Sequence, residues 1–261
     1  MSNPLPRVSI VMPVHNAAQT VALSLASVCG QQLTDWELIA VDHGSTDNSA
    51  CILREWAASD ARIRVAQLPG CRSGPSRPRN LGIAQAAGRY LAFLDADDIW
   101  YPNKLSTQLA AMVKHDTTLS CCGYHVFHDQ PGDTIGQLMP PLSAQYADLL
   151  KRNTAGCSTV MIDRERIGDI RFPECGHEDY ALWLSLMKSG RTMLGVQQCL
   201  AAYRRTPGSV SANKFRNISY LWHIYRHQEQ FSMPMSAFLT LRYAINALTK
   251  YRASPAGTVT S

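Results

Sequence analysis

The first 115 residues alternate short apolar runs, typical of strands, with segments whose apolar residues recur at helical spacing. The strand-like runs cover residues 7–14, 36–42, 63–68 and 90–94. The helical patterns cover residues 21–28, 50–58, 78–87 and 103–115. Such alternation predicts right-handed βαβ units and a parallel sheet covered by helices on both faces. The predicted fold class is therefore α/β, with a mostly parallel sheet.

The pattern loosens after about residue 116. Further strand-like runs cover residues 119–127, 158–162, 192–196 and 201–204. A helix is predicted to begin near Glu178, because Tyr180, Trp183, Leu184 and Met187 fall on one face. Residues 214–252 read as two helices separated near Met233 and Pro234. The chain of 261 residues is long enough for one large domain with a small appendage.

One strand-like run ends in three acids within four residues: "RYLAFLDADDIWYP" contains Asp95, Asp97 and Asp98. One aspartate at a strand end suits a turn or a helix N-cap. Three like charges this close repel, so the sequence favours a bound divalent cation. Ligands gather at the carboxyl ends of parallel strands, and residues 14–16 and 42–43 occupy two other such ends. We expect these segments to converge.

Missing motifs argue against a dinucleotide oxidoreductase and a P-loop enzyme. The sequence has no G-x-G-x-x-G after the first strand and no G-x-x-x-x-G-K-[ST]. An EF-hand is excluded because Trp100 stands where that loop needs glycine. A diphosphate would then be held mainly by a metal and by arginines, and "CRSGPSRPRN" offers Arg72, Arg77 and Arg79.

The cysteines and the hydropathy indicate the compartment. Eight cysteines are scattered without a Cys-x-x-Cys pair, which predicts buried reduced thiols in a cytosolic protein rather than disulfides. Residues 1–7 lack an apolar h-region, so we expect no secretory signal. No stretch reaches the apolar length needed to cross a bilayer.

A second acidic motif lies in "GHEDYALWLSLMKSG", where Glu178 and Asp179 begin the predicted helix. First-turn acids commonly just complement the helix dipole. A carboxylate held by an anchored helix can also act as a general base in a cleft. On position alone the dipole interpretation is the stronger one.

Four segments taken together, in this order and spacing, resemble a family 2 glycosyltransferase. They are "VSIVMPVHNAAQTV", "WELIAVDHGSTDNS", "SRPRNLGIAQAAGRYLAFLDADDIW" and "HEDYALWLSLMKSG". Within that family, "CSTVMIDRERIG" and "YRRTPGSVSANK" resemble the bacterial teichuronic-acid and O-antigen type. The resemblance implies a GT-A fold and inverting transfer of a sugar from a nucleoside diphosphate donor to a hydroxyl. It implies a catalytic domain over residues 1–215 and a C-terminal helical extension over 216–261.

The resemblance also implies roles for individual residues. Asp97, with Asp95, would hold Mn²⁺ or Mg²⁺ against the donor diphosphate, where the ion acts as a Lewis acid. Asp179 would be the base that deprotonates the acceptor, and Glu178 would orient it. For Asp98 the residues themselves suggest a purely structural role, as a cap of the helix near Pro102. The nucleotide-sugar would be bound by Pro13, Val14, Asn16, Asp42, His43, Arg79, Asn80 and Asp95.

Two positions depart from the family pattern. His43 stands where a second adjacent aspartate usually reads the uracil edge, so the base of the donor is open, with a UDP-sugar the first expectation. Thr206 and Pro207 stand where a histidine is often found, so a third protein ligand to the metal is also open.

The charge of the chain is uneven. Residues 202–261 carry eight Lys and Arg against one acid, a net charge of +7, whereas the rest carries −2. Phe238, Leu241, Ile245 and Leu248 share one helical face, with the basic residues Arg242, Lys250 and Arg252 and the tyrosines Tyr243 and Tyr251 beside them. This pattern suits either a helix on an anionic membrane surface or a helix packed on the domain.

The acceptors of the resembling type are built on polyprenyl diphosphate, which tips the balance toward the membrane. We therefore expect a cytoplasmic enzyme, peripheral on the inner face of the membrane, whose acceptor is lipid-linked and which binds no nucleic acid.

Two other functions remain open. A phosphatase-like hydrolase would want Thr or Val two residues beyond the second aspartate, and Ile99 fits that poorly. A weakly catalytic nucleotide-sugar or lipid-binding module is opposed by the intact D-x-D and Glu-Asp motifs. Transfer that depends on Mn²⁺ separates all three.

Overall fold

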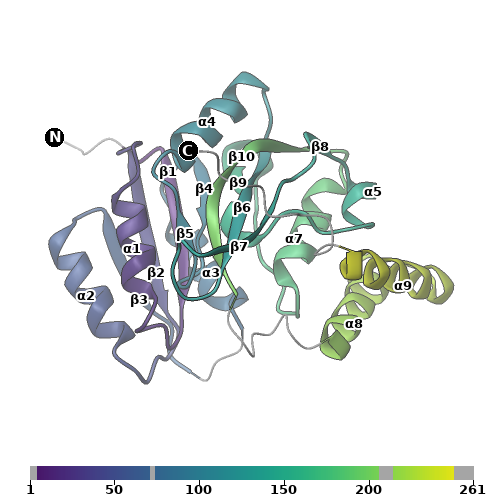
Figure 1. The fold of residues 1–261 in the computed structure, drawn as a ribbon, viewed down its shortest axis with the longest axis horizontal. Coiled ribbons are helices and arrows are strands. Elements are labelled where there is room, and N and C mark those ends of the chain that lie inside the picture. Colours follow the sequence, from purple (N-terminus) through teal and green to yellow (C-terminus); the bar gives the residue numbers. More distant parts are fainter. Residues whose placement is uncertain (1–4, 71–73, 206–213, 250–261) are drawn as a thin grey trace.

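The computed structural model describes residues 5–70, 74–205 and 214–249, and these form one continuous mixed sheet with helices on both faces (Figure 1). Neighbouring strands follow the order β3-β2-β1-β4-β9-β6-β10-β5, with β7 beside β6 and β8 beside β10. The N-terminal strands are β1 (Val8–Val14), β2 (Trp36–Asp42), β3 (Ile63–Gln67) and β4 (Tyr90–Phe93). All of their mutual pairings are parallel, which confirms the prediction for this half of the sheet.

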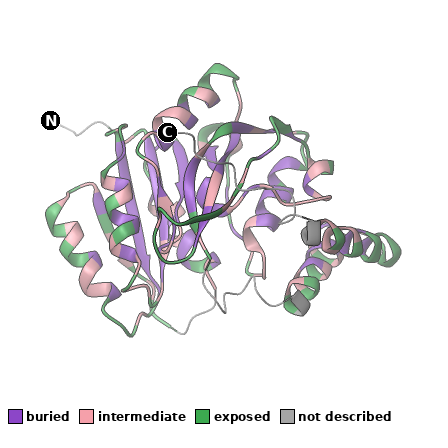
Figure 2. Cartoon of the chain, viewed as in Figure 1, coloured by how far each residue is buried: buried purple, intermediate pink, exposed green. Residues whose placement is uncertain are grey.

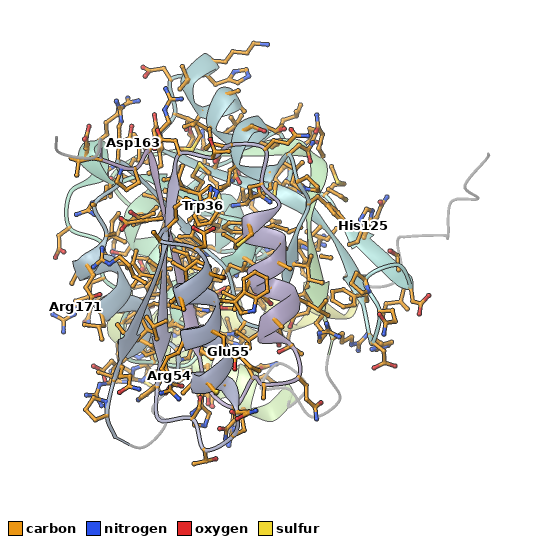
Figure 3. All side chains as sticks on the ribbon, turned by 90° about the vertical axis from the view of Figure 1, so that its left-hand side faces the viewer. Trp36, Arg54, Glu55, His125, Asp163 and Arg171 are labelled. Atoms are coloured by element: carbon orange, nitrogen blue, oxygen red, sulfur yellow. The ribbon has the colours of Figure 1, made fainter. Side chains whose placement is uncertain are left out.

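Side-chain alternation along β1 assigns the two faces of the sheet. Ile10 and Met12 belong to the hydrophobic cluster beneath α1 (Val21–Cys29), α2 (Ser49–Ser59) and α4 (Lys104–Lys114). Val11 belongs to the opposite cluster, which contains much of α7 (Glu178–Met187) and is packed by α3 (Ser76–Gln85). The strands are buried on both sides (Figure 2), as near-continuous apolar runs require. Arg54 and Glu55 lie on the outer side of α2 (Figure 3).

The second half of the sheet is mixed. Its strands are β5 (Ile99–Trp100), β6 (Leu119–Phe127), β7 (Thr134–Leu138), β8 (Ser143–Ala144), β9 (Met161–Asp163) and β10 (Met193–Arg204). β9 runs antiparallel to both β4 and β6, whereas β6 and β10 are parallel. The short helices here are α5 (Tyr146–Leu149) and α6 (Arg164–Ile167).

Two predicted strands differ from the structure. Residues 158–162 are split between a 3₁₀ turn, Cys157–Thr159, and β9, because Ser158 turns its side chain to the aspartates described below. The two runs at 192–196 and 201–204 are one strand, β10, whose register to β6 shifts between Val196 and Ala201. The strand continues through residues 197–200, which separate the two runs in the sequence, by shifting its register there.

The C-terminal helices are α8 (Lys214–His223), continued by a π-helical turn Ile224–Gln228, and α9 (Met233–Thr249). Pro234 lies in the first turn of α9, where the missing N–H is harmless, so the predicted break falls just before it. Leu221, Ile224 and Leu239 join the same core cluster as α7. The Tyr180 and Tyr225 hydroxyls are 2.9 Å apart.

The C-terminal extension thus packs on the α7 side of the molecule (Figure 1). The division at residues 215 and 216 stays a prediction. No helix among the described residues is both long and apolar enough to span a bilayer.

Candidate active site

The loops after β1 and β2 are tied to each other. Asn16 adopts a left-handed backbone conformation with φ 48°, and its Oδ1 accepts the backbone N–H of Thr46 at 2.8 Å. The His43 N–H donates to the Val14 carbonyl at 2.8 Å, which extends the parallel register of Val14 with Asp42. Pro13, Val14, Asn16, Asp42 and His43, all predicted donor-binding residues, therefore lie at one edge of the sheet.

Asp42 and His43 each bury a polar atom for which the described residues offer no hydrogen-bond partner. Asp42 is 6% exposed and its Oδ1 is unpaired, while His43 is 1% exposed and its Nε2 is unpaired. Burial lowers the pKa of His43, and the nearby positive charge of Arg77 lowers it further, so the imidazole is neutral at pH 7. Unpaired buried polar atoms are rare, and two in sequence indicate a place for a polar ligand.

The predicted acids separate into two environments. Asp95 and Asp97 are half-buried, whereas Asp98 is 2% exposed. Burial, together with the charge of Asp95, raises the pKa of Asp97 to about 6. Asp95 and Asp97 are therefore the two acids of this cluster that a ligand can reach, and a D-x-D metal site requires such access.

Asp98 does not cap a helix, so that prediction is wrong. Its carboxylate accepts the Ser158 hydroxyl at 2.6 Å and the Arg204 backbone N–H at 3.0 Å. α4 begins after Asn103, several residues further on. Asp98 instead joins the strand end to β10 and to the 3₁₀ turn; its partners are 60 and 106 residues away, so no local signal could reveal them.

Glu178 and Asp179 form the first turn of α7. The helix begins after His177, whose φ of 57° is left-handed. Asp179 Oδ1 accepts the Tyr180 N–H at 2.7 Å. Burial and the neighbouring Glu178 raise the pKa of Asp179 to about 7, against the charge of Arg79, which lowers it. A carboxyl group with this pKa is poised to accept a proton near neutral pH.

Arg79 joins the two acidic motifs. Its Nη2 lies 2.5 Å from Asp95 Oδ1 and its Nη1 lies 2.5 Å from Glu178 Oε1. The structure therefore brings the strand-end acids and the α7 acids together, a convergence that the edge-of-sheet argument, which covered residues 14–16, 42–43 and 95–98, did not include. The Arg79–Glu178 pair, 99 residues apart, was missed because the sequence analysis assigned Arg79 to the donor.

Asn80 was predicted to contact the donor, and its amide has other partners. Its Nδ2 donates to the Phe172 carbonyl at 2.9 Å, and its Oδ1 accepts the Phe172 N–H at 2.8 Å. These two bonds hold α3 against the segment that leads into α7. The amide keeps one N–H and one lone pair beyond these two bonds, so they fix its orientation without using all of its hydrogen-bonding capacity.

The donor set fits a divalent cation. The two carboxylates of Asp95 and Asp97 are hard oxygen ligands, and the raised pKa of Asp97 marks negative charge that a cation would offset. Among the described residues, no group of three or more His, Cys, Asp or Glu side chains is arranged to hold a metal. The remaining ligands would then come from the diphosphate and water; Arg72, Thr206 and Pro207 lie outside the described residues.

With this fold and this site, the chain is a family 2 glycosyltransferase. The model of that family, Glycosyl transferase family 2, matches residues 9–165. A relative from Bacillus subtilis (strain 168), named "Putative teichuronic acid biosynthesis glycosyltransferase TuaG", is 38% identical over 96% of this chain and 99% of its own length. A relative from Escherichia coli is 34% identical over 83% of this chain and 84% of its own. It is named "UDP-Glc:alpha-D-GlcNAc-diphosphoundecaprenol beta-1,3-glucosyltransferase WfgD".

Solved structures confirm the GT-A fold. The chain is similar to S. aureus TarS 1-349 in complex with UDP-GlcNAc, with a TM-score of 0.70 and 20% identity, over 84% of this chain and 64% of that one. It is also similar to the mannosyltransferase PcManGT from Pyrobaculum calidifontis in complex with GDP-Man and Mn2+. That match has a TM-score of 0.67 and 18% identity, over 98% of this chain and 77% of the other. At these identities the likeness establishes the fold alone.

Proposed function

We propose that this enzyme transfers a sugar, with inversion, from a UDP-sugar to a hydroxyl of a lipid-linked saccharide during bacterial surface polysaccharide synthesis. The observation that carries the proposal is the junction of two acidic motifs: Asp95, beside Asp97, is linked through Arg79 to the helix that bears Asp179. One motif suits a diphosphate-bound cation and the other a base, and a glycosyltransferase needs both in one cleft.

The donor would lie along the carboxyl edge of the sheet. Its base and ribose would meet the unpaired atoms of Asp42 and His43, beside the loop of Pro13, Val14 and Asn16. The UDP-dependent relative from E. coli and the UDP-GlcNAc complex of TarS support a uridine nucleotide. A neutral imidazole at position 43 can accept or donate one hydrogen bond to the base.

Asp97 and Asp95 would hold Mn²⁺ or Mg²⁺ against the two phosphates. The ion would neutralise charge on the departing diphosphate. The Mn²⁺ in the PcManGT complex supports this choice of ion. Asp95 also pairs with Arg79, so Asp97 is the acid whose charge the cation would chiefly offset.

Asp179 would be the base. As the acceptor oxygen forms its bond to the anomeric carbon, the bond from that carbon to the diphosphate breaks, and the hydroxyl proton passes to Asp179. Attack opposite the leaving group inverts the anomeric centre. The raised pKa of Asp179, about 7, suits a group that takes up a proton in the transition state.

Transfer is tested by UDP release with Mn²⁺ present and a GlcNAc-diphosphate-polyprenyl acceptor. UDP release that requires the acceptor, together with a product larger by one sugar, supports the proposal. UDP release that is equal without acceptor identifies a hydrolase, and donor binding without UDP release identifies a binding module.

Because the proposed acceptor is lipid-linked, the enzyme would bind it at the inner face of the cytoplasmic membrane. On α9 the side chains of Phe238, Leu241 and Ile245 are 57%, 64% and 54% exposed, and they surround a hollow with Arg242. Exposed apolar side chains grouped in this way need an occupant. The net charge of +7 over residues 202–261 favours an anionic lipid surface over a second copy of the chain, which would repel it.

Tyr243, predicted to lie beside this face, does not, since it packs inward on the Tyr180 ring at 5.6 Å between centroids. Tyr243 faces the core because it lies on the same side of α9 as the buried residues Ser236, Leu239 and Thr240. The side chain of Leu248, and Lys250, Tyr251 and Arg252, lie outside the described residues.

Vesicle co-sedimentation tests the membrane proposal. We expect binding that grows with anionic lipid, weakens with salt, and is lost in the Phe238→Asp, Leu241→Asp double variant. The matched control is Val113→Asp, because Val113 on α4 is also 64% exposed. Equal binding by the double variant and the control would show that α9 is not the membrane surface.

A further inference from the structure

Arg79 is held in place from several sides. Its side chain is 3% exposed, its guanidinium lies 5.1 Å from the centroid of the Phe172 ring, and the buried Cys157 thiol is near. The helix that carries it packs closely on the sheet. A Cβ at Gly82 would come within 2.5 Å of the Val11 side chain, so α3 lies in unusually close contact with β1.

The guanidinium points in two directions at once. One terminal nitrogen contacts Asp95, two residues beyond the end of β4, and the other contacts Glu178, the first residue of α7. Both distances are 2.5 Å, and the exposed fractions of the two carboxylate side chains are 31% and 13%. Ion pairs this short, made by a guanidinium that is itself 3% exposed, fix geometry as well as charge.

A direct role in holding phosphate is difficult for this side chain. Both terminal nitrogens already bond carboxylates, and Nε, which has no partner in the described part of the chain, is buried. A phosphate would have to displace a carboxylate, and displacing Glu178, whose side chain is 13% exposed, would leave a largely buried charge unpaired, which is unfavourable. The Arg79 contact with the donor that the sequence suggested is therefore the weaker interpretation.

We propose that Arg79 is a positioning residue that sets the spacing between the donor-binding acids and the base. By holding Asp95 it would orient one side of the cation site, and by holding Glu178 it would fix the first turn of α7, and with it Asp179. The inference rests on the proposed function, since it concerns the distance between the acceptor oxygen and the anomeric carbon that it attacks.

Arginine is required for this role because of its shape. A guanidinium offers several N–H groups in a rigid plane and can bridge two carboxylates from opposite sides. A lysine keeps the charge but has a single nitrogen on a flexible stem, so it cannot hold both partners in the same geometry. Arg79→Lys therefore keeps the positive charge while removing the bridge between Asp95 and Glu178.

The experiment compares wild type, Arg79→Lys, Glu178→Gln and the double variant, with Arg171→Lys as the control because Arg171 is exposed and lies at the surface (Figure 3). Donor affinity is measured by thermal shift with UDP and Mn²⁺, and transfer by kcat and KM. We expect Arg79→Lys to lower kcat roughly 10- to 100-fold while donor Kd changes less than about 3-fold, because misplacement impairs the reaction more than binding.

The double variant provides the decisive comparison. If the residues act as one unit, the double variant is no slower than the slower single variant. Additive losses, or a donor Kd raised about 10-fold or more by Arg79→Lys alone with little change in kcat, would overturn the proposal in favour of a phosphate contact.

Two further measurements test the role of Arg79 separately from the proposed function. Absence of transfer in the wild type would refute the proposed function rather than the role of Arg79. If Arg79→Lys fails to fold, the Arg79–Glu178 link is tested by Glu178→Gln alone, in which the arginine is intact. Glu178→Gln should then lower kcat with little change in donor Kd, and an unchanged kcat would overturn the proposal.

Discussion

Replacing Asp179 by Asn should abolish most of the activity and stabilise the fold, and the stabilisation should depend on pH. The folded protein raises the pKa of this carboxyl group from 3.8 to about 7. The protonated form therefore favours the folded state. Its stabilisation is fully present below the unfolded pKa, near 3.8, and is lost as the pH rises through about 7.

The structure sets the size of this effect. A shift of about 3 pH units corresponds to an upper limit of about 4 kcal/mol, at about 1.4 kcal/mol per unit. This limit includes the repulsion from Glu178, which the neutral Asn also relieves; because Asn reproduces the protonated carboxyl group only in part, we expect about 1–3 kcal/mol. Asn resembles the protonated carboxyl group at every pH, and its Oδ1 can still accept the Tyr180 N–H.

Urea unfolding of wild type and Asp179→Asn, followed by tryptophan fluorescence from about pH 5 to about pH 9, measures the difference in unfolding free energy. The gain in the variant should grow from pH 5 to pH 7 and then level off, while transfer falls roughly 10²- to 10⁴-fold. The control is Asp133→Asn, an exposed aspartate. A difference that does not change with pH, or a less stable variant at pH 8, would contradict the burial argument.

Two further substitutions test the donor side. Asp97→Ala should remove the Mn²⁺ dependence of donor binding, seen as loss of the Mn²⁺-dependent rise in Tm with UDP-sugar, because ligand bound only to the folded state raises Tm. An unchanged metal dependence would place the cation elsewhere. His43→Asp should strengthen the preference for uridine donors in a screen of nucleotide sugars, since a carboxylate accepts the uracil N–H better than a neutral imidazole does. Identical donor profiles would remove position 43 from base recognition.

The parts of the fold that local patterns encode were predictable. Strands β1, β2 and β4 are short apolar runs bounded by turns, and α7 shows its buried face as apolar residues at helical spacing. Because parallel strands share one carboxyl edge, the placement of Asp42 and Asp95 at the same edge of the sheet was predictable from strand direction alone.

Contacts between residues distant in sequence were not predictable in this way. Asp98 reads as a helix cap locally, yet its partners are Ser158 and the Arg204 backbone, supplied by a turn and a strand placed by tertiary packing. Tyr243 lies next to the exposed residues Phe238, Leu241 and Ile245 on the surface of α9. It faces Tyr180 because α7 packs against that side of the helix. A helical pattern shows that two apolar faces exist, but not which face meets the domain.

The arrangement of charge explains why so many acids are tolerated in one interior. Burial raises the pKa of Asp97, Asp98 and Asp179, so folding opposes the ionisation of each. Fixed donors offset part of this: the Arg204 N–H and the Ser158 hydroxyl serve Asp98, and Arg79 lies between the two acidic motifs. Asp97 is the member of this set whose charge a cation would offset most directly. Filling the donor site should therefore stabilise the fold beyond the contacts of the nucleotide itself, because the cation would remove repulsion that the empty protein retains.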